Sequence, residues 1–139
     1  MGYNLSEKNH YRYMDERSGS GMKKLAKERA EIYQVFSNEN RVLIFWNLAD
    51  KYEMTVNELA EAIGSTVQNT SQHLRLMKAK NILEATRDGQ MVRYRIADSL
   101  AGRYSLYIHR KNFEDIRNNK LSDDLFNFDI QIPDDFFDR

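Results

Sequence analysis

Four polar side chains that can read nucleic-acid bases lie close together between residues 67 and 80. They are two glutamines, an asparagine and an arginine: Gln68, Asn69, Gln72 and Arg75. At 100° per residue the four fall on one side of a helix, clustered in its first half. Amide side chains can bond adenine bidentately, and arginine can do the same to guanine. The pattern therefore indicates a base-reading face, although an ordinary solvated amphipathic helix would show it too.

The opposite side of this helix is predicted to face a core. Its stripe is apolar or β-branched: Val67, Thr70, Leu74 and Met77. Either Ser65 or Thr66 can cap the helix, which we expect to run to about Lys80.

A shorter helix is predicted just before it, over 58–63. Asn57 is a suitable N-cap, and Gly64 is the residue best able to end the helix with a positive φ. Two helices joined by a glycine-containing turn are typical of the helix-turn-helix, whose second helix enters the major groove of DNA.

A hairpin is predicted directly after these helices. Asp88-Gly89 favours a type I′ turn, which would place Arg87 opposite Gln90 and Glu84 opposite Arg93. Leu83, Ala85, Val92, Tyr94 and Ile96 would then share the face that packs on the helices. The tip would present Arg87 and Gln90, and Arg93 would follow on the other face. A basic-tipped hairpin in this position is a wing, placed to touch phosphates or the minor groove.

At this point the sequence resembles the ArsR-type winged helix-turn-helix transcription regulators over about residues 22–118. The matching runs are 32–37, 41–44, 58–60, 71–74, 77–78 and 89–94. The most family-specific pieces are the Ser-x-His-Leu that begins at Ser71 and the Gly-x-x-x-x-Tyr that begins at Gly89. The sequence departs from the family at Ser65, usually apolar, and at Asn81, usually glycine.

The resemblance implies a mainly α fold with a small β-hairpin, a winged helix-turn-helix that dimerises through its terminal helices. It implies a sequence-specific, homodimeric transcription regulator, most often a repressor, whose partner is double-stranded DNA. It also implies that Ser71 and His73 face DNA and that Arg41 lies near its backbone. The alternative is a winged-helix module that binds protein and not DNA.

The flanking segments are predicted to be amphipathic helices, Met22–Phe36 and about 100–118, the latter capped by Asp98 or Ser99. Each carries more apolar surface than one small winged domain needs to bury. Symmetric operators call for two-fold proteins, which favours a dimer. The predicted interface residues are Leu25, Ile32, Leu100, Tyr104, Tyr107 and Ile108. Between the two, a helix over 41–51 is apolar nearly all round, so it and Trp46 are expected in the core.

Charge is uneven along a chain of 139 residues whose formal net charge is zero. Residues 67–95 hold six basic and two acidic residues, a balance of +4, while 121–139 hold six aspartates and one arginine, a balance of −5. A local basic footprint is what attracts phosphate, so the neutral total does not count against DNA. The sequence also lacks a long apolar stretch, and we expect a cytoplasmic protein without a membrane span.

Metal sensing is common in this family, yet the ligands that it needs are missing from the sequence. There are no cysteines, and the three histidines, His10, His73 and His109, are too scattered for a zinc site within one chain. We expect no metal and no cofactor, and we expect His109 to be solvated or at an interface. No nucleophile, phosphate loop or catalytic carboxylate pair indicates an enzyme. The signal is left open: a small molecule, a partner protein, or none.

Two extensions flank the predicted domain of residues 22–118. Residues 1–21 are interpreted as an arm and linker, with a possible short helix over Ser6–Arg17. Residues 119–139 form an acidic aromatic tail in which apolar and polar residues alternate from 126 to 132, before Pro133. We expect its apolar face to dock on the domain or on the dimer mate, and we expect its aspartates to compete with DNA. A solvated, unstructured tail is the alternative.

Overall fold

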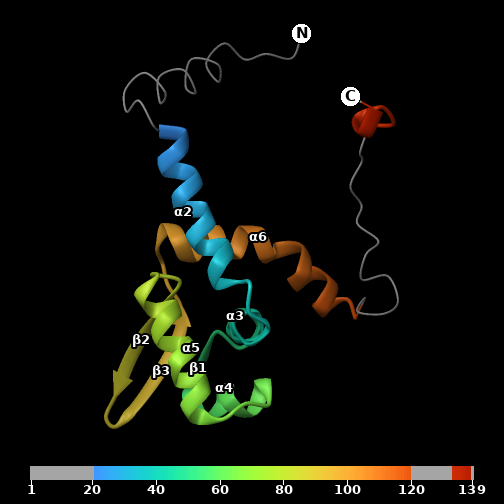
Figure 1. The fold of residues 1–139 in the computed structure, drawn as a ribbon. Helices are drawn as coiled ribbons and strands as arrows, with labels where there is room; N and C mark the ends of the chain where they lie inside the picture. The colour runs from blue at the N-terminus through green and yellow to red at the C-terminus, as the bar shows by residue number, and fades with distance from the viewer. Residues whose placement is uncertain (1–20, 120–132, 139) are drawn as a thin grey trace.

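The computed structural model describes residues 21–119 and 133–138. The expected helix over Ser6–Arg17 and the alternating segment 126–132 lie outside these ranges. The elements, in order, are α2 (Gly21–Val35), α3 (Glu39–Lys51), β1 (Glu53–Thr55), α4 (Val56–Ile63), α5 (Val67–Ala79), β2 (Leu83–Asp88), β3 (Met91–Ile96), α6 (Leu100–Arg117) and the 3-10 turn η1 (Phe136–Asp138). Figure 1 shows α2 and α6 at one end, with α4, α5 and the sheet at the other.

Helix α3 is the centre of the fold, as its nearly continuous apolar sequence predicts. It contacts α4, α5, α6 and two strands, and its side chains Ile44, Phe45 and Leu48 are buried. Around them the core collects Leu59 from α4, Leu74 and Met77 from α5, and Ile82, Leu83 and Met54 from the sheet region. The helices that would meet DNA are therefore fixed on the same core as the terminal helices.

Capping residues set where the helices begin. Asn38 accepts a hydrogen bond from the Arg41 amide, so α3 begins at Glu39, two residues before the predicted start. The predicted Asn57 cap is wrong: Thr55 caps α4 and forms a capping box with Glu58, three residues later. Gly64 ends α4 with φ of +67°, as expected, and of the two candidate caps it is Thr66 that begins α5.

The sheet differs from the prediction in two ways. It has three antiparallel strands in the order β1-β3-β2, and β1, only three residues long, carries too little pattern to be found in the sequence. The predicted hairpin register is also wrong, because Glu84 pairs with Arg95 and Arg87 with Val92. The chain turns at Gly89-Gln90, where positive φ at Gly89 alone fits a type II′ turn and not the expected type I′. The shift is two residues, so each side chain keeps its predicted face.

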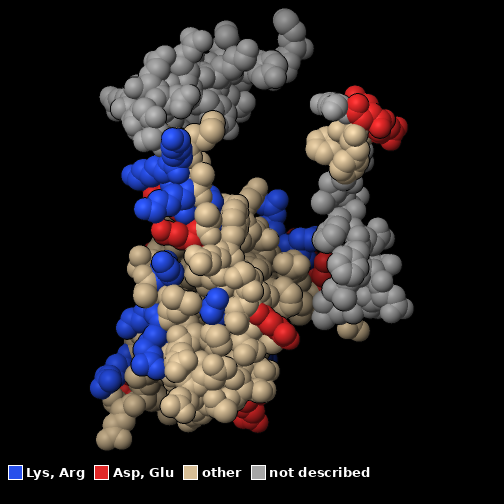
Figure 2. Space-filling model, in the orientation of Figure 1, with Lys and Arg blue, Asp and Glu red and all other residues tan. Residues whose placement is uncertain are grey.

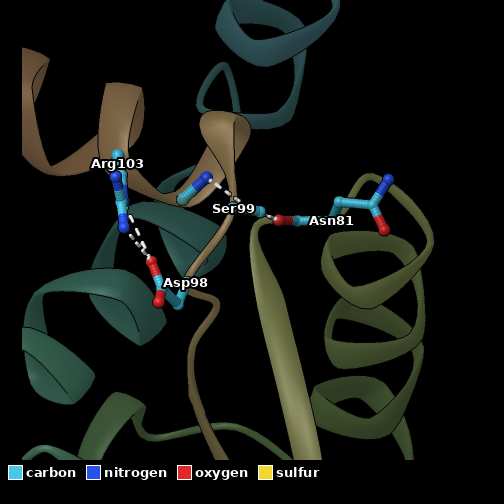
Figure 3. Close-up of polar contacts among 5 residues, drawn as sticks. Asn81, Asp98, Ser99 and Arg103 are labelled. Carbon is cyan, nitrogen blue, oxygen red and sulfur yellow. Dashed lines mark hydrogen bonds and ion pairs between the residues drawn. The ribbon is translucent and has the colours of Figure 1, made fainter.

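The start of α6 is tied to the short segment that follows α5. Ser99 caps α6 by accepting a hydrogen bond from the Gly102 amide at 2.9 Å, and its hydroxyl donates to the carbonyl of Asn81 at 2.5 Å (Figure 3). Asn81 has φ of +61°, a left-handed conformation that asparagine tolerates in place of the family's usual glycine. A Cβ on Gly102 would lie 2.0 Å from the carbonyl oxygen of Ala97, so only glycine fits there. Asp98 and Arg103 add an exposed ion pair beside this junction.

Candidate nucleic-acid interface

The predicted reading face of α5 is open to solvent. Gln68, Gln72 and Arg75 are exposed, whereas Asn69 is half-buried. The Asn69 amide nitrogen donates to the Ser65 hydroxyl at 2.9 Å, which holds this side chain against the turn between α4 and α5. The structure thus leaves Gln68, Gln72 and Arg75 as the accessible members of the reading face, with Asn69 fixed beside them.

The opposite stripe of α5 is confirmed for three of its four residues. Thr70, Leu74 and Met77 are buried, and the Thr70 hydroxyl donates to the Thr66 carbonyl at 2.7 Å. Val67 is 45% exposed, so its assignment to the core was wrong. It is the first residue of α5, at the end away from the core, and it adds an apolar contact surface beside Gln68.

Arg41 and His73, which lie 32 residues apart in the sequence, meet where α3 begins. Arg41 Nη1 lies 3.3 Å from His73 Nδ1, and Arg41 Nε donates to the carbonyl of Val35 at 2.7 Å. Burial, and then the positive charge of Arg41, lower the pKa of His73. A neutral His73 accepts from Arg41 through Nδ1 and carries its proton on Nε2, where it can donate to a phosphate oxygen. Ser71, half-buried on the same helix, accepts from Arg75 Nε at 3.3 Å through its carbonyl.

The wing carries exposed positive charge at its end. Arg87 and Gln90 are exposed, while Arg93 is half-exposed and pairs with Thr86, so the two arginines lie on opposite faces of the hairpin. Figure 2 shows Lys and Arg side chains gathered along the edge that includes this hairpin. The Thr55 amide and hydroxyl, and more weakly Arg93, lower the pKa of Glu58. Arg93 therefore lies within electrostatic reach of the α4 capping box.

The charge pair expected between Glu84 and Arg93 does not form. Glu84 instead binds Arg95, whose Nε lies 2.5 Å from the carboxylate, because the hairpin turns one residue later than predicted. Within residues 21–119 and 133–138, Arg93 forms no ion pair with a carboxylate. Its charge consequently remains available to a phosphate group.

The predicted dimer residues are mostly exposed in the single chain. Leu25, Leu100 and Tyr107 are 39%, 87% and 59% exposed, and Tyr104 and Ile108 are partly buried. Ile32 is only 6% exposed and packs within its own chain, so it offers a second subunit little surface. Large apolar side chains left in water on two adjacent helices mark an interaction surface.

Sequence reasoning missed a ladder of rings and cations on these helices. The hydroxyls of Tyr33 and Tyr104 lie 2.5 Å apart, and Arg29 lies over the Tyr104 ring at 3.8 Å. Tyr107 stacks on Tyr104, and Arg110 covers Tyr107 at 4.2 Å. The spacing of Tyr104, Tyr107 and Arg110 at every third residue was the available signal. The ladder joins α2 to α6 and so fixes the shape of the exposed face.

We expected His109 to be solvated or at an interface, and this prediction is wrong because the residue is buried within its own chain. It is 7% exposed and enclosed by Phe36, Phe45, Trp46 and Phe113, which we call the aromatic box. The Trp46 indole donates to His109 Nδ1 at 3.0 Å, while Nε2 is buried without a partner. Burial lowers the pKa of His109 to about 4. In residues 21–119 and 133–138 no group of three His, Cys, Asp or Glu side chains could hold a metal ion.

Comparison with known proteins places this geometry in a family. A cadmium resistance regulator CadC homolog from Staphylococcus aureus is 30% identical over 88 residues, which span 60% of this chain and 73% of that protein. The chain belongs to the ArsR family of winged helix-turn-helix regulators. No family model matches it. The regulator KmtR from Mycobacterium tuberculosis is 38% identical over 66 residues, 48% of this chain, and the chain spans about half the length of the first curated relatives it matches.

Solved structures of ArsR-like regulators agree with this placement and confirm the predicted fold. A homodimeric winged helix-turn-helix DNA-binding domain from Mycobacterium bovis is 25% identical, with a TM-score of 0.56 over 70% of this chain and 89% of that chain. The repressor BigR from Xylella fastidiosa is 28% identical, with a TM-score of 0.53 over 63% of this chain and 90% of that chain. Among the described residues of this ArsR-family chain, no helix has the length and apolarity needed to cross a membrane.

Proposed function

We propose that this ArsR-family chain is a homodimeric, sequence-specific DNA-binding regulator that represses transcription. The observation that carries the proposal is the exposed reading face of α5 beside a basic wing. Its relatives bear the names of transcriptional regulators, and BigR is described as a repressor. A regulator of transcription works where the DNA is, which fits the cytoplasmic location that the sequence favours. None of these relatives is named as an enzyme.

In this proposal α5 enters the major groove. Gln68, Gln72 and Arg75 meet base edges, because their polar groups are exposed on one side of the helix. Val67 adds an apolar contact of the kind that suits a thymine methyl group. Asn69 and Ser71 hold the start of the helix in place and lie at the edge of this contact.

Phosphates on either side are bound by residues outside the reading face. His73 and Arg41 form one group at the start of α3, and Arg87, Gln90 and Arg93 form the other on the wing. Such contacts fix the register of the protein on the duplex and supply most of the sequence-independent affinity. Residues 22–118 supply every group that this model needs.

The dimer is proposed to form through α2 and α6. Leu25, Leu100, Tyr107 and the edges of Tyr104 and Ile108 provide apolar surface that the single chain leaves in water. The Mycobacterium bovis domain, described as homodimeric, supports this assignment. Two copies of α5 related by a two-fold axis would read two half-sites about 34–36 Å apart.

The inducing signal is proposed to differ from that of relatives named for cadmium resistance. The sequence has no cysteine to supply thiolates, and softer metal ions prefer such ligands. We expect a small molecule or a partner protein to act instead. Zinc, cadmium or arsenite at micromolar concentration should leave the protein–DNA complex intact in a gel-shift assay.

The test is a gel shift with the DNA upstream of the protein's own gene against an unrelated fragment of equal length. We expect tight binding to the first, with a roughly 10³-fold or greater preference that is typical of specific regulators. Light scattering should show two chains, and Tyr107→Asp should yield monomers that bind the same fragment weakly. Binding to neither fragment would favour the protein-interaction module, and equal binding to both would contradict sequence-specific recognition.

A further inference from the structure

A small apolar pocket lies between α3 and the second half of α6. Its volume is about 230 Å³, and its apolar walls are Trp46, Leu106, Phe113 and Ile116. Two charged residues also line it, Asp50 from α3 and Arg117, the last residue of α6. Two of the walls, Trp46 and Phe113, belong to the aromatic box around His109. A ligand in this pocket would therefore contact the rings that join α6 to the core.

The size of the pocket limits what it can hold. Pockets for drug-sized ligands are about 300–1,000 Å³, so this one suits a single aromatic or branched side chain better than a large effector. Its walls are mainly carbon, which favours an apolar occupant. Asp50 and Arg117 bring opposite charges to its edge, so a carboxylate next to the apolar group of the occupant would be favoured only on the Arg117 side.

The same chain exposes a matching group near its carboxyl end. Phe136 and Phe137 are 51% and 81% exposed in the turn η1, and their rings meet edge to face with centroids 5.0 Å apart. A buried aromatic side chain removes about 150–250 Å² from water, so leaving two adjacent rings exposed forgoes considerable stabilisation. Asp138 follows the pair directly and Asp134 lies two residues before it, so carboxylates are close to the rings in sequence.

The connection between pocket and ring pair is short in sequence. Arg117 lines the pocket, and the eighteen residues 118–135 separate it from Phe136. A chain of this length spans up to roughly 60 Å at about 3.3 Å per residue, which is ample for a return to the pocket. Covalent tethering also gives the pair an effective concentration on the order of millimolar at the pocket, so modest affinity is sufficient.

We propose that Phe136-Phe137 docks in the α3/α6 pocket of its own chain, with one ring between Trp46 and Phe113 and the flanking aspartates facing Arg117. The docked pair covers the side of α6 where it meets the core and closes the outer wall of the aromatic box. This is an intrachain contact separate from DNA binding, and it holds whether or not the chain is a repressor.

Trp46 provides a direct probe, since it is the only tryptophan in the sequence and it lines the pocket. In the full-length protein, Phe136→Ala/Phe137→Ala should increase acrylamide quenching of Trp46 and shift its emission to longer wavelength. Met91→Ala, which removes an exposed apolar side chain on the hairpin, is the matched control and should change neither. Equal quenching in the wild type and the double variant overturns the proposal.

A photo-crosslinker identifies the occupied surface. Full-length protein with p-benzoylphenylalanine at position 137 should crosslink within one chain, to peptides that contain Trp46 or Leu106. Filling the pocket by Ala49→Leu should abolish these crosslinks, because Ala49 lines the pocket and is half-buried. A crosslinked band of two chains would place the pair on a second copy and overturn the intrachain contact, as would crosslinks to other surfaces or none.

Discussion

The reading face of α5 and the aromatic box around His109 use polar side chains in opposite ways. On α5 the amides of Gln68 and Gln72 are exposed to water, and we propose that they bond DNA bases. In the box the imidazole of His109 is withdrawn from water and receives one hydrogen bond, from Trp46. Helix α3 lies against both regions, so they share a core and differ mainly in exposure.

The two described histidines show what this difference means. His73 is half-buried beside Arg41, where one nitrogen is engaged and the other can still reach a phosphate. His109 is surrounded by rings from α3, α6 and the turn that follows α2, and its second nitrogen meets no partner. Changes to the surface polar groups should therefore alter the affinity for DNA and leave the free energy of unfolding nearly unchanged. Changes to the box should lower the free energy of unfolding and leave the affinity of the folded protein for DNA nearly unchanged. Four predictions test this separation, in order of decreasing effect.

The largest effect should come from emptying the box. His109→Ala leaves a cavity among four rings and removes the acceptor of the Trp46 indole, and we expect a loss of about 3 kcal/mol in the free energy of unfolding. His109→Phe also removes this acceptor, but it keeps a ring in the box and leaves no cavity, so it should lose less. Urea unfolding monitored by circular dichroism, at fixed protein concentration, measures both.

His73→Ala serves as the control for this pair. It changes a half-buried histidine outside the box and should alter the free energy of unfolding by less than about 1 kcal/mol. If His109→Ala unfolded at the same urea concentration as the wild type, the box would not be a stabilising element.

The second prediction is that lowering the pH destabilises the protein through the same residue, His109. The pKa of His109 is about 4 in the folded protein and 6.5 when exposed, so between these values the unfolded chain binds more protons. Burial of the neutral imidazole therefore makes its full contribution to the free energy of unfolding above pH 6.5. This contribution is lost as the pH falls toward 4. At about 1.36 kcal/mol per pKa unit, the difference amounts to roughly 3 kcal/mol.

His109→Phe is the matched control for acid, because it has no proton to bind at this position. Unfolding measured between pH 7 and pH 4 should show a shallower decline for the variant than for the wild type. Parallel declines would mean that carboxylates, and not His109, set the acid sensitivity.

These two regions also show which features of the structure could be predicted from the sequence and which could not. The reading face follows from helical periodicity, which depends only on residues within one helix, and Gln68, Gln72 and Arg75 are exposed as predicted. The environment of His109 depends on Phe36 and Phe45, 73 and 64 residues earlier in the sequence. No local pattern brings these rings together. The burial of His109 among phenylalanines therefore could not be predicted without the fold.

The hairpin could be predicted from the sequence only in part. Its strands and their faces follow from two-residue alternation, but the register depends on which two residues occupy the turn. Asp88-Gly89 and Gly89-Gln90 both offer a glycine, and the second lets Asp88 and Met91 extend the ladder by one pair. The Arg95–Glu84 ion pair fits this register and not the predicted one.

The third prediction concerns the exposed reading face of α5. Gln72→Ala and Arg75→Ala should each weaken specific DNA binding by about 1–3 kcal/mol while leaving the free energy of unfolding nearly unchanged. Gln34→Ala removes the same exposed amide from α2 and should leave binding unaffected. Titration against specific and random duplexes separates base reading from positioning: equal losses on both would make these residues phosphate contacts.

The smallest effect is expected from the wing, where the contact is electrostatic and carries little sequence information. Each phosphate contact contributes about 0.9 to the slope of log affinity against log salt, so Arg87→Ala should flatten that slope by nearly one unit. Arg93→Ala should flatten it less, because the nearby Glu58 carboxylate offsets part of the charge that Arg93 presents. Lys24→Ala, which removes an exposed charge on α2 outside the wing, is the control and should leave the slope unchanged. Arg87 and Arg93 lie on opposite faces of the hairpin, so comparing their two slopes also indicates which face of the wing meets the duplex. Unchanged slopes in both variants would remove the wing from the interface and confine DNA recognition to α5 and the Arg41–His73 pair.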